Sequence, residues 1–136
     1  DLKDKESDYA ACYEMKQKFE KCILLHESCN PTEVKNTLAQ MDIVIAARMH
    51  ASIGAFSSGV FTIPFAYSRK FQGYYEVLDY PVMVDGKTDA TDIAVEKTLS
   101  YIKRYQEYDI QIQKSHDLAQ SKLDIFYKQI SLLLSK

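Results

Sequence analysis

Two side chains that could bind an anion and transfer a proton stand close together in the middle of the sequence. Arg48 carries a planar guanidinium that can donate two parallel hydrogen bonds to a carboxylate or a phosphate. His50 has an imidazole that can donate a hydrogen bond or transfer a proton near neutral pH. Both follow the apolar residues 41–47 and precede small residues that end at Gly59. This pattern predicts a strand that leads into a closely packed helix, with Arg48 and His50 at the junction.

Other polar side chains follow the ends of neighbouring apolar runs. Ligands of open parallel sheets bind outside the carboxyl ends of the strands, and a helix that begins there adds free N–H groups. We therefore predict a local anion site, with one of Arg69 and Lys70 facing water. Each residue could instead be structural, because an arginine can bridge to a carboxylate and a histidine can simply pack. The candidates are Arg48, His50, Ser52 and Lys70, with His26, Tyr67 and Ser68 as weaker ones.

Strands and helices are predicted to alternate along most of the chain. Residues 41–47 are β-branched and apolar without alternation, which predicts a strand in the centre of a sheet, covered on both faces. Pro64 cannot donate to a strand ladder, so we expect it at an irregular or end position. The predicted order is a helix over 7–19, then strands over 21–26, 41–47, 61–67 and 80–85, separated by helices over 31–39, 48–59 and 71–78.

The last third of the chain is predicted to be helical. No glycine or proline interrupts the sequence after residue 88, and apolar residues recur at near-helical intervals, so one long helix or two in tandem are expected. The predicted fold class is α/β, a Rossmann-like parallel sheet flanked by helices, with a long helical C-terminal tail. Residues 1–88 would form the core. Residues 89–136 would pack on it, on a missing domain or on a second copy, which leaves a homodimer open.

Composition limits the classes of function. The 136 residues suffice for one domain, and 17 basic against 19 acidic side chains give a net charge of −2. Non-specific binding of nucleic acid is therefore not expected. Three cysteines without a close pair, and three scattered histidines, predict no disulfide framework and no metal site. No run reaches the length of a membrane span, so we expect a cytoplasmic protein. The polar opening without a starting Met predicts an excised piece of a longer protein.

Two stretches around these candidates carry a family resemblance. Residues 42–56 read DIVIAARMHASIGAF and residues 59–73 read GVFTIPFAYSRKFQG. Together they resemble the carboxy-terminal signature of the polysaccharide pyruvyl transferase family. That pattern has an Asp that opens an apolar strand, Arg-x-His-Ala at its end, a small-residue helix up to a glycine, a strand with a proline, and Tyr-x-x-Lys. The resemblance covers residues 20–85.

The resemblance implies a two-domain enzyme similar to GT-B glycosyltransferases, of which residues 1–88 would be the donor-binding half. Phosphoenolpyruvate would be the donor substrate, with no cofactor, and a sugar or lipid-linked oligosaccharide would accept the enolpyruvyl moiety as a ketal. Arg48 would bind the donor's carboxylate or phosphate, His50 would be the general acid, and Lys70 would assist. The partners implied are an N-terminal domain of the same chain and, through the acceptor, the membrane surface. The fragment alone would be inactive.

Two other readings stay open at this point. A GT-B glycosyltransferase would place the diphosphate of a nucleotide-sugar at the same cationic rim, and would need an acidic residue to hold the ribose hydroxyls. Glu27 and Asp85 are the candidates near that rim, and neither follows a glycine-rich turn. A non-catalytic α/β interaction module would instead use its helical tail to dimerise.

Overall fold

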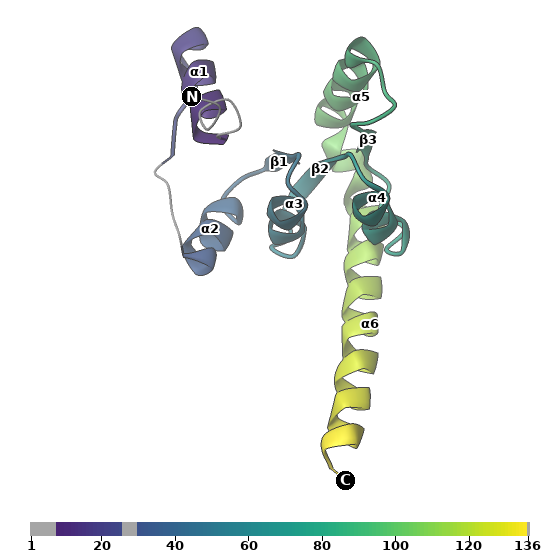
Figure 1. The fold of residues 1–136 in the computed structure, drawn as a ribbon. Helices are drawn as coiled ribbons and strands as arrows, with labels where there is room; N and C mark the ends of the chain where they lie inside the picture. The colour runs from purple at the N-terminus through teal and green to yellow at the C-terminus, as the bar shows by residue number, and fades with distance from the viewer. Residues whose placement is uncertain (1–7, 26–29, 136) are drawn as a thin grey trace. The chain divides into compact units, whose positions relative to one another are not determined.

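The computed structural model describes residues 8–25 and 30–135, and its contacts divide the chain into two compact units, Asp1–Val34 and Lys35–Lys136. In the first unit, the helix predicted over 7–19 is confirmed as α1 (Asp8–Lys18) (Figure 1). The strand predicted over 21–26 is wrong for its described part, because Cys22–Leu25 has no regular structure and Ile23 is 84% exposed. An apolar run forms a strand only where a neighbouring strand accepts its backbone hydrogen bonds.

The second predicted helix is confirmed as α2 (Pro31–Leu38). The Asn30 side chain accepts a hydrogen bond from the Thr32 N–H over 2.9 Å, as an N-cap residue does. Pro31 occupies the first helical position, where a missing N–H costs nothing. Local chemistry therefore explains where this helix begins.

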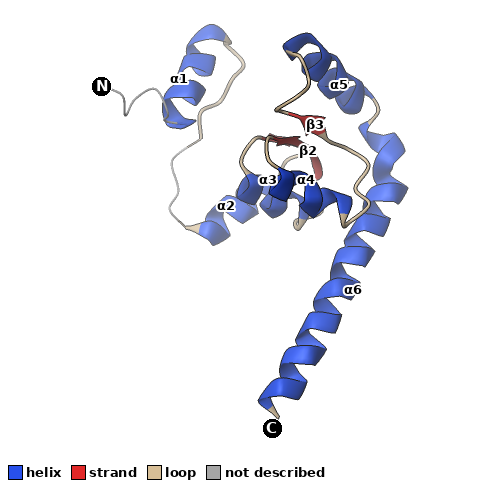
Figure 2. Cartoon of the chain, turned by 45° about the vertical axis from the view of Figure 1, so that its right-hand side comes forward, coloured by secondary structure: helices blue, strands red, loops and turns tan. Residues whose placement is uncertain are grey.

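The second unit contains a parallel sheet with three strands among the described residues. The strands are β1 (Ile43–Ala46), β2 (Phe61–Ala66) and β3 (Val84–Asp85), in the order β1-β2-β3. Helices α3 (Met49–Phe56) and α4 (Arg69–Glu76) lie on one side of the sheet, and α5 (Thr91–Lys103) lies on the other (Figures 1 and 2). The predicted α/β class, with a parallel sheet flanked by helices, is confirmed.

Two expectations about the middle of the sheet are wrong. The strand predicted to be central, β1, is at the edge of the described sheet, and Ile45 is half exposed. Among the described strands, β1 pairs with β2 alone. Pro64 lies inside β2, which is the central strand. There it is the last β2 residue in register with β1, and pairing with β3 starts at Phe65, so the missing N–H falls where the ladder passes from one neighbour to the other.

The strand predicted over 80–85 is confirmed only for its last two residues, Val84–Asp85. The Tyr80 hydroxyl donates to the Thr62 carbonyl over 2.8 Å and accepts from the Thr62 N–H over 3.1 Å. A side chain thus supplies the hydrogen bonds that a longer β3 would have given to β2. Pro81, which has no N–H, could not have continued the ladder. Burial raises the pKa of Tyr80, which keeps its hydroxyl protonated as a donor.

Gly59 ends the α3 segment as predicted. Its φ of +79° lies in the left-handed region, where only glycine is unstrained. The Val60 N–H reaches back to the Ala55 carbonyl over 3.2 Å, which closes the end of the helix. The predicted strand-to-helix-to-strand sequence around Arg48 is therefore confirmed.

The carboxy-terminal third is helical as predicted, in two main helices rather than one. Helix α5 is followed by the short 3₁₀ helix η2 (Tyr105–Tyr108) and by α6 (Asp109–Leu134). The turn is stabilised by Arg104, which donates to the Glu107 carboxylate over 2.7 Å. In the described part of the chain, none of the helices has both the length and the apolar composition needed to cross a bilayer.

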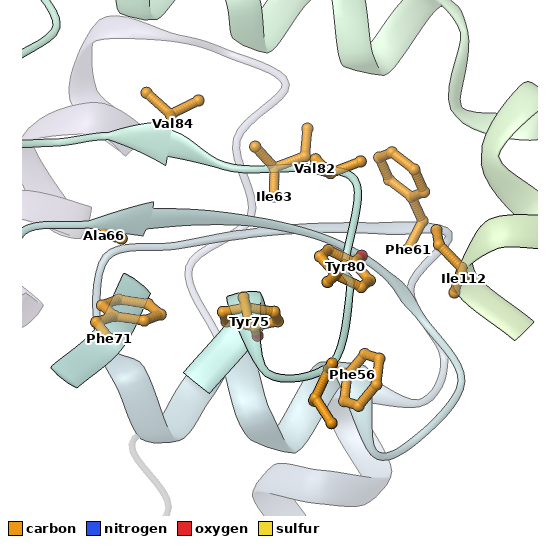
Figure 3. Close-up of a cluster of buried hydrophobic side chains, with 11 residues drawn as sticks. Phe56, Phe61, Ile63, Ala66, Phe71, Tyr75, Tyr80, Val82, Val84 and Ile112 are labelled. Carbon is orange, nitrogen blue, oxygen red and sulfur yellow. The ribbon is translucent and has the colours of Figure 1, made fainter. Parts of the chain in front are cut away.

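The hydrophobic core lies between the sheet, α3, α4 and the first turns of α6 (Figure 3). The Phe56 ring is 2% exposed and meets the rings of Tyr75 and Tyr80 edge-on, at centroid distances of 6.1 and 5.4 Å. Ile112 brings α6 into the same cluster. Residues after position 88 thus contribute to the core of the second unit.

His116 of α6 makes the stability of this core depend on pH. Its ring stacks on Phe56 at a centroid distance of 4.2 Å, and its Nε2 is buried without a hydrogen-bond partner among the described residues. Burial lowers the pKa of His116 below the ordinary 6.5, against a smaller opposing effect of Asp117. The unfolded chain therefore binds a proton at a pH where the folded chain does not. Stability is fully present above about pH 6.5 and falls as the pH drops below it.

We expect the midpoint of thermal unfolding to fall between pH 7 and pH 5, and to fall less in His116→Phe. Phenylalanine keeps a flat ring on Phe56 and removes the titrating group. The measurement is a series of thermal melts followed by circular dichroism. Equal pH dependence in the two proteins would contradict the assignment to His116.

Candidate functional site

The carboxyl ends of the three strands meet at one edge of the sheet, because all the strand pairs are parallel. Ala46, the last residue of β1, pairs with Pro64, and Ala66, the last residue of β2, pairs with Asp85 of β3. The segments that follow the three strands therefore begin close to the same level of the sheet. This edge, with residues 47–50, 67–72 and 85–88, is called the rim below.

Arg48 and His50 come to the rim from β1. Arg48 is the N-cap residue of α3, with extended backbone angles, and its carbonyl accepts the Ser52 N–H over 3.1 Å. His50 lies in the first turn of α3, and both residues are exposed. The first N–H groups of a helix have no carbonyl partner within it and carry the positive end of its dipole. A cation, an imidazole and a helix start thus lie within three residues, on the solvent side.

A pocket of about 200 Å³ lies at the ends of β2 and β3. Ser68 is the N-cap of α4, and its hydroxyl accepts the Phe71 N–H over 3.3 Å. Tyr67 is 54% exposed and meets the Phe71 ring edge-on. The pocket is lined by two cationic side chains, Arg69 and Lys87, and by one carboxylate, Asp85, so its cations outnumber its anions. Its lining residues are Tyr67, Ser68, Arg69, Gln72, Asp85, Lys87 and Thr88.

The Asp85 carboxylate holds the far wall of this pocket in place. It accepts hydrogen bonds from the Lys87 N–H over 2.8 Å, the Thr88 N–H over 3.0 Å and the Gln72 side chain over 2.9 Å. Hydrogen bonds from Thr88, followed by that from Lys87, lower the pKa of Asp85. The carboxylate therefore stays ionised near neutral pH and is suited to positioning rather than to proton transfer.

A second carboxylate extends this network behind the pocket. The Asp85 N–H donates to Asp89 over 3.0 Å, and Asp89 pairs with Lys97 of α5 over 2.7 Å. The loop from β3 to α5 is thereby fixed at both ends. The Asp85 carboxylate, one of the two candidates for holding a nucleotide ribose, already accepts three hydrogen bonds. Glu27, the other candidate, lies outside the described residues.

The remaining predicted site residues differ in their positions. Ser52 is fully buried, and its hydroxyl donates to the Met49 carbonyl over 2.8 Å within α3. Lys70 is exposed on α4 and does not line the pocket that Arg69 lines. His26 lies outside the described residues. Among the residues that the structure describes, no group of three or more His, Cys, Asp or Glu side chains is placed to hold a metal ion.

Gln72, Lys87 and Thr88 are rim residues that the sequence analysis missed. Lys87 and Thr88 directly follow β3, so the strand-end rule that selected Arg48 could have found them. Gln72 carries no such signal, because it lies four residues after the α4 N-cap and reaches Asp85 only through the packing of α4 beside β3. The structure brings Tyr67 and Ser68 together with these three residues in one pocket.

The comparisons with known proteins give one match. The family model described as "Polysaccharide pyruvyl transferase" matches residues 1–69, which is 69 of the 136 residues. The matched segment includes β1, α3 and β2 together with Arg48 and His50, and it ends one residue before Lys70. No curated protein and no solved structure matches the chain.

Proposed function

Because the chain belongs to the polysaccharide pyruvyl transferase family, we propose that it contains the donor site of an enzyme that transfers the enolpyruvyl group of phosphoenolpyruvate to a sugar. The product would be a cyclic ketal that bridges two sugar hydroxyls, with release of phosphate. The observation that carries the proposal is the placement of Arg48 and His50, which are both exposed at the carboxyl end of β1, within the matched segment.

The donor carries a carboxylate and a phosphate, and the rim offers cations for both. Arg48 would bind one of these groups with two parallel hydrogen bonds, supported by the N–H groups at the start of α3. Arg69 and Lys87 line the neighbouring pocket and would attract the second anionic group. The same cations would stabilise the phosphate as it leaves. Lys70 would add a charge at the mouth, whereas the buried Ser52 hydroxyl is engaged within its own helix.

His50 would start the reaction by giving a proton to the methylene carbon of the donor. Protonation turns that carbon into a methyl group and leaves positive charge on the neighbouring carbon and its oxygen. One sugar hydroxyl adds to this electron-poor carbon and loses its proton, the bond to phosphate oxygen breaks, and a second hydroxyl adds and loses its proton. One of the two hydroxyl protons restores His50, and the other leaves with the phosphate.

The acceptor side of the reaction extends the proposal. We assign the acceptor to the polysaccharide or its lipid-linked precursor, as the family implies. Residues that hold the acceptor would come from an N-terminal domain of the same chain, in a GT-B-like pair of domains. A lipid-linked acceptor would bring the enzyme to the membrane surface.

The test is a transfer assay with the full-length protein, phosphoenolpyruvate and polysaccharide prepared from the cells that make it. We expect phosphate release that depends on the polysaccharide, together with a new methyl resonance of the ketal in the NMR spectrum of the product. In Arg48→Ala the KM for phosphoenolpyruvate should rise roughly 10-fold to 100-fold, since a hydrogen bond to a charged group is worth about 1.5–3 kcal/mol.

Arg104→Ala is the matched control for this assay. Arg104 is also exposed, but it pairs with Glu107 at the end of α5, away from the strand ends. Its KM should equal that of the wild type. Equal KM values for Arg48→Ala and the wild type would remove Arg48 from the donor site, and a failure of all proteins to form ketal would overturn the proposed activity.

A further inference from the structure

The side chains on one face of α6 follow a seven-residue repeat. They recur at alternating steps of four and three residues, which is the spacing of the a and d positions of a coiled coil. The series is Ile112, His116, Ala119, Leu123, Phe126, Ile130 and Leu133. A repeat of seven residues is shorter than two full turns of a straight α-helix, and it keeps one face toward another helix when the two supercoil.

The first part of this series is covered by the chain's own core. Ile112 is 8% exposed, His116 stacks on Phe56, and Ala119 packs against the core cluster. The seven-residue series therefore packs on the core from the first turn of α6 onward. The a and d face of α6 is therefore the face that packs on the core in this part of the helix.

The second part of the series continues beyond the core, where Ile130 is half-buried and the other members are exposed. Leu123 is 46% exposed, Phe126 54% and Leu133 71%. Tyr127 and Leu134, which flank the series on the same face, are also exposed. In Figures 1 and 2 this half of α6 extends away from the sheet. The residues from Leu123 to Leu134 on this face are called the tail stripe below.

We propose that the tail stripe packs against the tail stripe of a second copy of this chain, as a short two-helix coiled coil. A second copy presents the same repeat, so its side chains fit the same spacing. A large side chain buries about 150–250 Å², and those of the stripe are on average roughly half exposed, so each could still bury about 100 Å². Full burial of all six would then remove at most roughly 600 Å² from each copy, or roughly 1,200 Å² in all. That area reaches the lower limit for specific protein interfaces.

The charges beside the tail stripe permit this pairing. The positions that border the seam are Gln120, Lys122, Tyr127, Gln129 and Leu134, of which only Lys122 is charged. Two copies would therefore not bring blocks of like charge together at the edges of the seam, where such charges decide which helices pair. The interaction does not depend on the proposed activity.

A membrane surface suits the tail stripe less well than a second copy. A helix that lies in the membrane interface needs a strongly charged opposite face, rich in Lys and Arg. Here the opposite face of the tail carries Ile125 and Leu132, which are 54% and 69% exposed, beside Asp124 and Lys128. The repeat of apolar residues at a and d positions is instead the pattern of a coiled-coil seam.

Two double variants with the same composition test the proposal in the full chain. Leu123→Glu with Ile130→Glu places two charges in the tail stripe. Leu132→Glu with Ile125→Glu makes the same two replacements on the opposite face of the same helix. We expect sedimentation across a concentration series to show a dimer for the wild type and for the second variant, and a monomer for the first. Circular dichroism should show equal thermal midpoints for the folded core of the two variants at low concentration.

Other outcomes would overturn the proposal. A wild type that stays monomeric over the whole series excludes the pairing, and so does a dimer that survives in the Leu123→Glu, Ile130→Glu variant. A flotation assay with phosphatidylglycerol vesicles tests whether the tail stripe binds a membrane instead. Wild-type protein that is monomeric and floats with the vesicles, while the stripe variant does not, would assign the tail stripe to a membrane and not to a second copy.

Discussion

Replacing His50 by Gln is expected to lower kcat for pyruvyl transfer by about 10²-fold to 10⁴-fold, the contribution typical of a positioned general acid. Glutamine keeps a hydrogen-bond donor at the start of α3 but cannot give up a proton to carbon. The KM for phosphoenolpyruvate should change little, because Arg48 and the pocket cations would still bind the donor. Steady-state kinetics of phosphate release in the presence of the polysaccharide measures both constants.

Two further measurements separate proton transfer from a structural effect at His50. Transfer in deuterated water should place one deuterium in the ketal methyl group, and added imidazole should restore part of the activity of His50→Ala. The matched control is His116→Gln, because His116 is a core histidine stacked on Phe56, away from the rim. That variant should lose stability and keep its kcat at low temperature. Wild-type turnover in His50→Gln would eliminate His50 as the acid.

Replacing Phe56 by Ala is expected to cost about 3–5 kcal/mol of folding stability. The ring is 2% exposed and touches Tyr75, Tyr80 and His116, so its removal leaves a cavity in the core (Figure 3). Domains of this kind are stable by only about 5–15 kcal/mol. The loss should be visible as a large shift of the urea midpoint of the second unit.

Phe19→Ala is the matched control for this stability measurement. Phe19 is 57% exposed in the first unit, so removing its ring should change the free energy of unfolding by no more than about 0.5 kcal/mol. Equal urea midpoints for the two variants would show that the aromatic cluster around Phe56 does not hold the second unit together.

Much of the fold could be predicted from local sequence signals. Asn30 and Pro31 mark the start of α2, Gly59 closes the α3 segment, and the uninterrupted carboxy-terminal third is helical. These signals act within one or two turns of the chain. The strand positions of β1 and β2 were also predictable, because continuous apolar runs bounded by turns have few other conformations that bury them.

Which apolar runs form strands, and how long those strands are, was not predictable in the same way. Residues 22–25 and residues 43–46 are both short apolar runs, yet only the second forms a strand in the described structure. Whether a run pairs depends on a partner strand distant in the sequence. The length of β3 depended on such a partner as well, since the Tyr80 hydroxyl takes the hydrogen bonds of Thr62 that a longer strand would have used.

The residue types at the candidate site were determined by the sequence alone. Arg48 and His50 follow an apolar strand and open a helix, and those two local facts place them at the rim. The tertiary structure decided which other side chains share that edge. Gln72 meets Asp85, and Asp85 orders the loop that carries Lys87, only because α4 packs beside β3. Local sequence signals determine the secondary structure of a segment, whereas contacts between distant segments determine its neighbours. A pocket is formed by such long-range contacts, so its full lining could not be predicted from local signals.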